Sequence, residues 1–298
     1  MTILKVCTDS FGNIGSQGCQ KNNPFTDAVS LIIATKGFEF ASFTSFATQA
    51  DWETAIKAKQ VFPLHGIVEF EDQSEDVQYY ETASGVRIPR RQGKYRYMYM
   101  YNLPLEVHKA LQTFRNASVE VFVVDSAGNV SGYSPDGVKV KGMSVGMINP
   151  EKMKPALQDN TPAFSPLAID MADEKQWNEQ GVFVTPGWSP LLLEPVSSVE
   201  LSVVSATATN IVIKVGYFQG IAPDGSDDLV GISGIEEADF VWATTNPDPG
   251  MTDNGDGTYA FSGTGMVSGT VDLKPPSTAV SAGPPIENTE GPVPVTIS

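Results

Sequence analysis

Short runs of alternating hydrophobic and polar residues dominate this chain, and only three stretches show the spacing of a helix. The clearest alternation is KYRYMYMY at Lys94–Tyr101, where tyrosine occupies every second position. Successive side chains of a β-strand point to opposite faces, so this run predicts a strand with one face of tyrosines. Residues 66–72 and Val119–Val124 predict two further strands in the same part of the chain.

The three helical stretches are short. Thr48–Asp51 resembles a capping box and predicts a helix through about Gln60, and Asp170–Gln180 predicts an acidic helix that carries Trp177. A third helix is expected over Pro104–Phe114, because proline is tolerated in the first turn of a helix. The apolar positions of this third helix are expected on one face: Leu103, Val107, Leu111 and Phe114.

Turn signals follow these elements. Asp125–Asn129 and Pro135–Gly137 predict hairpin turns, and Val138–Met143 predicts a strand with its lysines outward. The second part of the chain alternates between turn clusters and short β patterns, which is typical of a β-sandwich of immunoglobulin type. Six strands are expected there: Val199–Val204, Ile211–Tyr217, Phe240–Thr244, Thr258–Ser262, Thr270–Leu273 and Val293–Ile297.

Proline and glycine mark a boundary near Pro186–Pro195, where the composition also changes. We therefore expect two domains, residues 1–190 and residues 195–298. The chain has 298 residues, of which 41% are hydrophobic, enough to form a packed core. Its 27 glycines and 21 prolines favour turn-rich β structure, so the expected fold is mainly β with few short helices.

The net charge of −16 is unevenly distributed along the chain. Residues 1–194 carry 17 basic and 22 acidic side chains, whereas residues 195–298 carry 2 basic and 13 acidic ones. Such a balance argues against binding to a nucleic-acid backbone by neutralising its phosphates, and against adsorption to anionic membranes. Neither a secretory signal nor a long apolar run is evident, which indicates synthesis in the cytoplasm without a membrane anchor.

No motif of catalytic chemistry occurs in the sequence. The two histidines, His65 and His108, lie in no metal-binding or nucleophile pattern, and we expect structural or surface roles for both. Asp253–Gly257 (DNGDG) lacks the alternating carboxylates of a calcium loop and predicts a tight turn. Cys7 and Cys19 allow a disulfide, although two reduced thiols suit a cytosolic product better. We therefore expect neither an enzyme nor a cofactor.

One constellation of charges stands out around the turn expected at Thr82–Gly85. Six acids precede this turn, and five bases follow it. Either the two arms form a solvated hairpin with weak internal ion pairs, or the two charge blocks meet neighbouring copies of the same protein. The second interpretation makes these residues candidates for subunit contacts: Glu71, Asp72, Glu75, Asp76, Arg87, Arg90, Arg91, Lys94 and Arg96.

The order of these elements resembles the major tail tube proteins of long-tailed bacteriophages. The resemblance is carried by the loop Glu71–Gly93, the strand Lys94–Tyr101, the helix Pro104–Phe114 and the strands of 119–148. In addition, GDGTYAFSGTG at 255–265 is similar to bacterial and phage Ig-like domains.

This resemblance implies hexameric rings that stack into a hollow tube. The long loop would bridge to the adjacent ring, and the Ig-like domain would decorate the outside. The partners would be further copies of the chain and other virion proteins, and DNA would pass without specific binding. The protein would then reside in the virion after synthesis in the host cytoplasm.

Two alternatives remain open at this stage. A capsid decoration or head-fibre protein would also carry an outward-facing Ig-like domain. An adhesion or carbohydrate-binding module would use the tyrosines of Lys94–Tyr101 as a sugar-binding platform.

Overall fold

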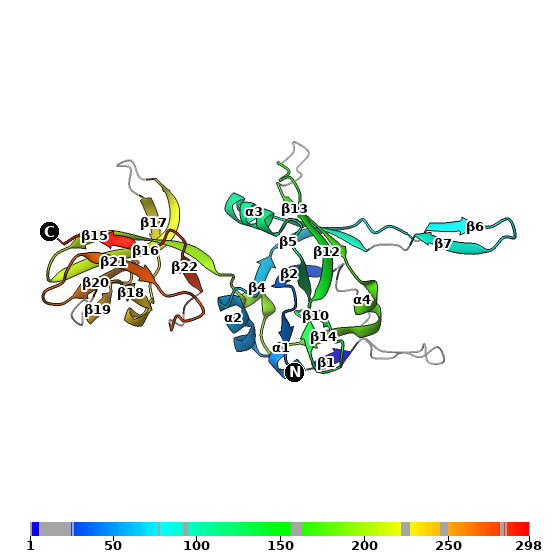
Figure 1. The fold of residues 1–298 in the computed structure, drawn as a ribbon, viewed down its shortest axis with the longest axis horizontal. Coiled ribbons are helices and arrows are strands. Elements are labelled where there is room, and N and C mark those ends of the chain that lie inside the picture. Colours follow the sequence, from blue (N-terminus) through cyan, green and yellow to red (C-terminus); the bar gives the residue numbers. More distant parts are fainter. Residues whose placement is uncertain are drawn as a thin grey trace. The chain divides into compact units, whose positions relative to one another are not determined.

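The structure is a computed structural model, and it divides the chain into two compact units, residues 1–193 and residues 194–298. Strands make up 49% of the described residues and helical residues 14%, which confirms the expected mainly β fold. Figure 1 shows the strands and helices of each unit. The structure describes residues 2–5, 25, 27–76, 78–91, 95–155, 163–221, 227–244, 250–280, 283 and 285–297.

Unit 1 is built on a twelve-stranded sheet that forks at strand β9 (Val119–Asp125). Strand β2 (Ala28–Thr35) pairs with β9 along its whole length, whereas β10 (Val130–Tyr133) and β12 (Met143–Pro150) share its other edge. One branch continues from β10 to β14 and β1, and the other from β12 to β13, β8 and β5. The remaining strands of this sheet are β1 (Thr2–Lys5), β3 (Glu39–Phe40), β4 (Val61–His65), β5 (Ile67–Asp72), β8 (Arg96–Tyr101), β11 (Val140–Lys141), β13 (Ser165–Met171) and β14 (Gly181–Thr185).

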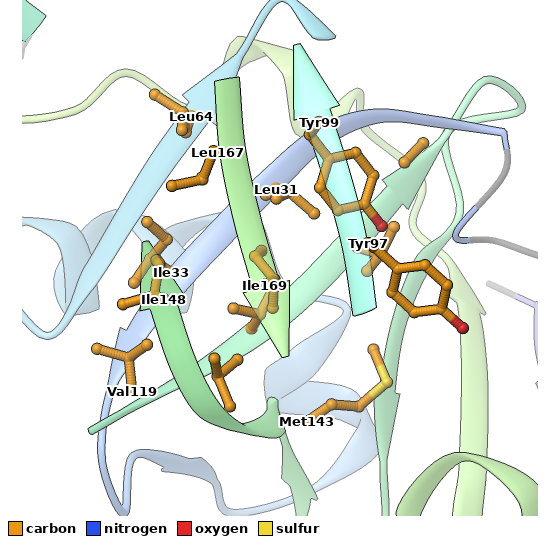
Figure 2. Close-up of a cluster of buried hydrophobic side chains, with 14 of the residues drawn as sticks. Leu31, Ile33, Leu64, Tyr97, Tyr99, Val119, Met143, Ile148, Leu167 and Ile169 are labelled. Atoms are coloured by element: carbon orange, nitrogen blue, oxygen red, sulfur yellow. The ribbon is translucent and has the colours of Figure 1, made fainter. Parts of the chain in front are cut away.

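The core of unit 1 lies between the β2–β9 region and the branch that ends in β8 and β5. Figure 2 shows side chains from β2, β8, β12 and β13 converging there, among them Leu31, Tyr99 and Ile169. Every residue of β9 is buried, as expected for a strand in the middle of a sheet that is covered on both faces. The expected turn at Asp125–Asn129 joins β9 to β10, and the Asp125 carboxylate accepts the N–H groups of Ala127 and Asn129.

The other face of β9 is covered by two helices, α1 (Phe43–Phe46) and α2 (Gln49–Lys57). Their aromatic side chains pack with those of the sheet, and Trp52 of α2 lies 5.2 Å from Phe122 of β9 between ring centroids. The expected helix after Thr48 is therefore present, but the expected capping box is wrong. Thr48 makes no side-chain bond to the first amides of α2, because its hydroxyl donates to the Thr44 carbonyl of α1 instead.

Helix α3 (Leu105–Leu111) and the 3-10 turn η1 (Gln112–Phe114) follow β8 as the sequence predicts. The expected apolar face is only partly correct, since Leu111 is buried but Val107 is 38% exposed. His108 is buried in its place. On a helical projection, residues 107 and 108 lie on either side of Leu111. A small rotation of the helix about its axis therefore decides which of the two side chains faces the core.

Helix α4 (Glu174–Gln180) is shorter than the sequence indicates. Asp170 belongs to β13, where it pairs with Arg96 of β8, and the helix begins only after Asp173. The Asp173 side chain accepts the N–H of Lys175, and this cap fixes the start of the helix. Trp177 packs its edge against Phe25 and Phe183 at the rim of the core.

Unit 2 is a β-sandwich with its own core. A six-stranded sheet has the order β19-β20-β16-β15-β22, with β17 paired to β16, and a three-stranded sheet has the order β18-β21-β23. Tyr259 and Phe261 from the first sheet pack with Phe240 and Val271 from the second. The strands are β15 (Ser197–Ala206), β16 (Asn210–Ile221), β17 (Asp227–Gly231), β18 (Phe240–Trp242), β19 (Gly250–Asp253), β20 (Thr258–Ser262), β21 (Gly269–Leu273), β22 (Ile286–Asn288) and β23 (Val293–Val295).

All six strands expected in this part of the chain are present, and three more were not expected. Strands β17, β19 and β22 have the sequences DDLVG, GMTD and IEN, which show no strand-like alternation. They form because neighbouring strands supply hydrogen-bond partners along their length. Two 3-10 turns also occur: η2 (Pro190–Leu192) follows the last strand of unit 1, and η3 (Glu237–Asp239) directly precedes β18 in unit 2. Among the described helices, none is long and apolar enough to cross a membrane.

Candidate functional site

The charged segment of unit 1 forms a separate hairpin of two strands, β6 (Gln78–Glu81) and β7 (Arg87–Arg91). In the described part of the chain these two strands pair only with each other. Thr82 closes the turn, since its N–H donates to the Val86 carbonyl at 2.9 Å, and Gly85 takes a φ of +78° that favours glycine. The turn expected at Thr82–Gly85 is therefore present. Figure 1 shows the hairpin projecting away from the body of unit 1.

The base of the hairpin is held by backbone and hydroxyl groups where β5 and β8 end. The N–H of Gln73 donates to the Arg96 carbonyl at 2.9 Å, and the N–H of Arg96 donates to the Ser74 hydroxyl at 3.2 Å. The N–H of Ser74 in turn donates to Asp72 at 2.9 Å. These hydrogen bonds fix the position at which the hairpin extends from the ends of β5 and β8.

Large apolar side chains are exposed on this hairpin. Tyr80 and Ile88 are register partners, so they share one face, and they are 60% and 50% exposed. Tyr79 and Val86 are exposed to a similar extent. An isolated two-stranded hairpin is only marginally stable in water, and contiguous exposed apolar residues mark interaction surfaces. This hairpin therefore presents an exposed apolar surface and is the candidate interaction site of unit 1.

The structure places the nine candidate contact residues in different surroundings. Glu71 and Asp72 are exposed on β5, and Glu75 and Asp76 are exposed on the segment between β5 and β6. Arg87 lies on β7 with its Nε 3.5 Å from a Glu81 carboxylate oxygen, an exposed pair of the kind that stabilises a fold only weakly. Of Arg90 and Arg91 the backbone in β7 is described, and Lys94 lies outside the described residues.

Arg96 differs from Arg87 because its acidic neighbours lie far from it in the sequence, in the body of unit 1. Its Nε lies 3.5 Å from Asp170 of β13, and its Nη2 lies 4.0 Å from Glu151. Arg96 is only about one-third exposed, and β8 and β13 place it opposite Asp170 by register. Arg96 therefore forms ion pairs at the base of the hairpin, whereas Arg87 lies on strand β7 of the hairpin itself.

The tyrosines of β8 are part of the core and do not form an exposed platform. Tyr97, Tyr99 and Tyr101 are 6%, 1% and 0% exposed, and Tyr97 stacks on Phe25 with ring centroids 4.8 Å apart. Burial raises the pKa of Tyr99 and Tyr101 well above the ordinary value of 10.0. The sequence feature on which a sugar-binding role depended is thus absent from the surface.

The two histidines serve the interior of unit 1. His65 Nε2 donates to the Leu193 carbonyl at 2.7 Å, and Ser30 Oγ lies 2.7 Å from His65 Nδ1. A serine hydroxyl this close to a histidine is the spacing of a nucleophile and its base, but Ser30 is fully buried and no substrate can reach it. Within the described residues, no group of three or more His, Cys, Asp or Glu side chains could hold a metal ion.

The glycine-rich start of the chain, with Cys7 and Cys19, lies outside the described residues. The signal that the sequence did offer for the apolar surface of the hairpin is the pair Tyr79-Tyr80 and the segment VRIP at 86–89, inside a block too charged to enter a core. Neither a scan against protein-family models nor a search of curated proteins finds a match to this chain. The functional argument therefore rests on the hairpin and on the two units.

Proposed function

We propose that this protein is a structural protein of a phage virion, which self-assembles into stacked rings that form the tail tube. The observation that carries the proposal is the β6–β7 hairpin, which has an exposed apolar face, a basic strand, and no partner strand outside the hairpin among the described residues. A second copy of the chain is the partner that fits, because acids and bases lie in separate blocks on one loop and can face their opposites on the next copy.

The kind of interface that such an arm makes favours rings and tubes. The hairpin is one patch of the molecule, and the surface that receives it on the next copy is a different patch. Contacts between two different patches are heterologous, and they generate closed rings or open helical stacks rather than simple dimers. The hexameric ring itself is what the resemblance to tail tube proteins implies, and it is part of the proposal.

Charge supports the same role. A net charge of −16 on each subunit keeps DNA from adhering to a surface along which it must slide. Unit 2 has an independent sandwich core, so it can be carried by the tube without taking part in its wall. The proposal assigns no catalytic step to any described residue.

Electron microscopy of the purified protein tests this proposal directly. The parent chain is expected to form rings or tubes at high concentration, with the tubes lengthening as the concentration rises. A variant with residues 76–94 replaced by a short Asp-Gly turn is expected to keep a folded unit 1, because β5 and β8 pair without the arm. This variant should form no tubes. A parent chain that stays monomeric at every salt concentration and pH would refute self-assembly.

A capsid decoration or head-fibre protein is the second candidate, and the independent core of unit 2 is the observation that favours it. Such a protein would display unit 2 from the virion surface and would not need stacked rings. Trimers in the same micrographs would support a fibre, and monomers that bind purified capsids would support a decoration protein. An adhesion module loses its main support, because the tyrosines of β8 are buried.

A further inference from the structure

The turn between β19 and β20 contains Asn254-Gly255, the only Asn-Gly dipeptide in the sequence. Asparagine followed by glycine is especially prone to spontaneous deamidation, because glycine lacks the Cβ that would hinder its backbone nitrogen from approaching the asparagine side chain. Both residues are exposed, so water reaches the turn.

The reaction needs only water. The backbone nitrogen of Gly255 forms a bond to Cγ of Asn254, the bond from Cγ to Nδ2 breaks, and ammonia leaves with the proton that the Gly255 nitrogen loses. One water molecule then opens the resulting succinimide ring at either of its carbonyl groups. Opening at one carbonyl gives aspartate, and opening at the other gives isoaspartate, which adds a methylene to the main chain.

The fold holds both reacting groups in hydrogen bonds that oppose this attack. The N–H of Gly255 donates to Asp253 Oδ1 at 2.8 Å, and Asn254 Nδ2 donates to Thr258 Oγ1 at 2.9 Å. The N–H of Asn254 also donates to the Thr258 carbonyl at 3.0 Å. The Gly255 nitrogen can approach Cγ only after the first two bonds break and the asparagine side chain rotates.

We propose that Asn254-Gly255 is a latent deamidation site, which the side chains of Asp253 and Thr258 hold in an unreactive geometry. The turn itself is open, since a Cβ added to Gly255 would meet nothing within 4 Å, but the chain is closely packed two residues farther along. A Cβ added to Gly257 would lie 2.2 Å from the Cα of Gly231 on β17, so two backbones already touch there. Tyr259, two residues farther along, is fully buried in the core of unit 2. An extra methylene in the turn would push these strands apart and loosen unit 2.

Peptide mapping by mass spectrometry tests the proposal on the full chain. The protein is incubated at mildly alkaline pH, native and in urea, and the conversion of the amide to the acid at Asn254 is followed with time. Native protein is expected to react at least about tenfold more slowly than unfolded protein, the factor that one ordinary hydrogen bond supplies. Thr258→Val and Asp253→Ala should each react faster than the parent, because each removes one of the two bonds, whereas Thr258→Ser, which keeps the hydroxyl, should stay slow.

Two controls separate protection by these bonds from loss of folding. Circular dichroism establishes that each variant is folded, and Thr252→Val removes a hydroxyl from the neighbouring exposed strand and should leave the rate unchanged. Hydrogen exchange of the Gly255 amide should be slow in the parent and fast in Asp253→Ala. The proposal is overturned if the native chain reacts as fast as the unfolded chain, or if folded Thr258→Val and Asp253→Ala react as slowly as the parent.

Discussion

Tyr80 and Ile88 lie directly opposite each other across the two strands of the β6–β7 hairpin, and more than half of Tyr80 and half of Ile88 are exposed. Cross-strand pairs of an aromatic and a β-branched residue stabilise a hairpin by about 0.2–1 kcal/mol, which is small against the entropy of ordering both strands. Under the proposed function, this exposed pair is the part of the hairpin that contacts another copy.

Replacing this pair should impair assembly and leave the subunit intact. In the double variant Tyr80→Ser with Ile88→Ser, the melting temperature should hardly move, since exposed substitutions usually change stability by about 0.5 kcal/mol or less. Light scattering should show a smaller mean assembly at a given concentration. Val138→Ser alters a residue that is 57% exposed outside the hairpin, and it should assemble as the parent does. Equal assembly of all three proteins would exclude the hairpin face as a contact.

Charge reversal on β7 should act in the same direction. Arg90→Glu with Arg91→Glu would set like charges against the acids of the neighbouring copy, and a loss of even about 1 kcal/mol per contact repeats around a ring. Sedimentation should then show subunits in place of rings, with an unchanged melting temperature. Glu75→Lys with Asp76→Lys in the same chain should restore part of the assembly if these acids are the partners. Assembly of the arginine variant at the parent's level would mean that the hairpin is only solvated.

Glu120 on the central strand β9 should make unit 1 more stable in acid. Burial raises the pKa of this carboxyl above its ordinary value of 4.5, and only its Oε1 has a hydrogen-bond partner, the N–H of Gly37 at 3.1 Å. The raised pKa means that the stabilising contribution is complete below the ordinary value and is lost as the pH rises through the folded-state pKa. Glu120→Gln should remove this pH dependence in urea unfolding followed by tryptophan fluorescence.

Glu39 provides a control of opposite sign for that measurement. The hydrogen bond from Lys139 lowers the pKa of the Glu39 carboxyl, so its contribution is present at neutral pH and is lost as the pH falls. Glu39→Gln should therefore weaken unit 1 at neutral pH relative to acid. If Glu120→Gln keeps the parent's pH slope, the buried carboxyl has no part in it.

Tyr259 should govern the stability of unit 2 at alkaline pH. Its hydroxyl donates to the Ile232 carbonyl at 2.6 Å and accepts the Ile235 N–H at 3.2 Å, and burial raises its pKa from 10.0 to about 12. The stabilising contribution should be present below pH 10 and be lost between pH 10 and about 12. Tyr259→Phe should lower the free energy of unfolding by about 1–3 kcal/mol at neutral pH and flatten this alkaline loss. A variant with the parent's midpoint in urea would contradict this role.

Unit 2 should fold by itself when residues 194–298 are expressed alone. Its core draws on both of its sheets, from Val199 of β15 to Val295 of β23, and every residue of this cluster belongs to unit 2. Circular dichroism should show β structure, and heating should give one cooperative transition. A fragment that stays unfolded would mean that the sandwich depends on the first 193 residues.

The sequence alone was sufficient for the class of fold and for most elements, because these depend on local physics. Alternation with period two predicted β8, and a run of strand-forming apolar residues predicted β9. The turn at Thr82–Gly85 followed from residues that tolerate tight backbone geometry. The sequence also predicted an exposed hairpin, because the charged residues on both sides of this turn cannot be buried in a core. What the sequence did not show is that Tyr80 and Ile88 form an exposed apolar face within that block.

Only the tertiary structure decided which residues meet across long distances in the chain. Arg96 lies beside Asp170 and Glu151, the tyrosines of β8 are enclosed by β2 and β13, and α3 buries His108 in preference to Val107. Each of these outcomes depends on how strands that are far apart in sequence pair and in what register. Register is set by the simultaneous packing of many side chains, and a shift of one residue would turn every side chain of a strand to its other face.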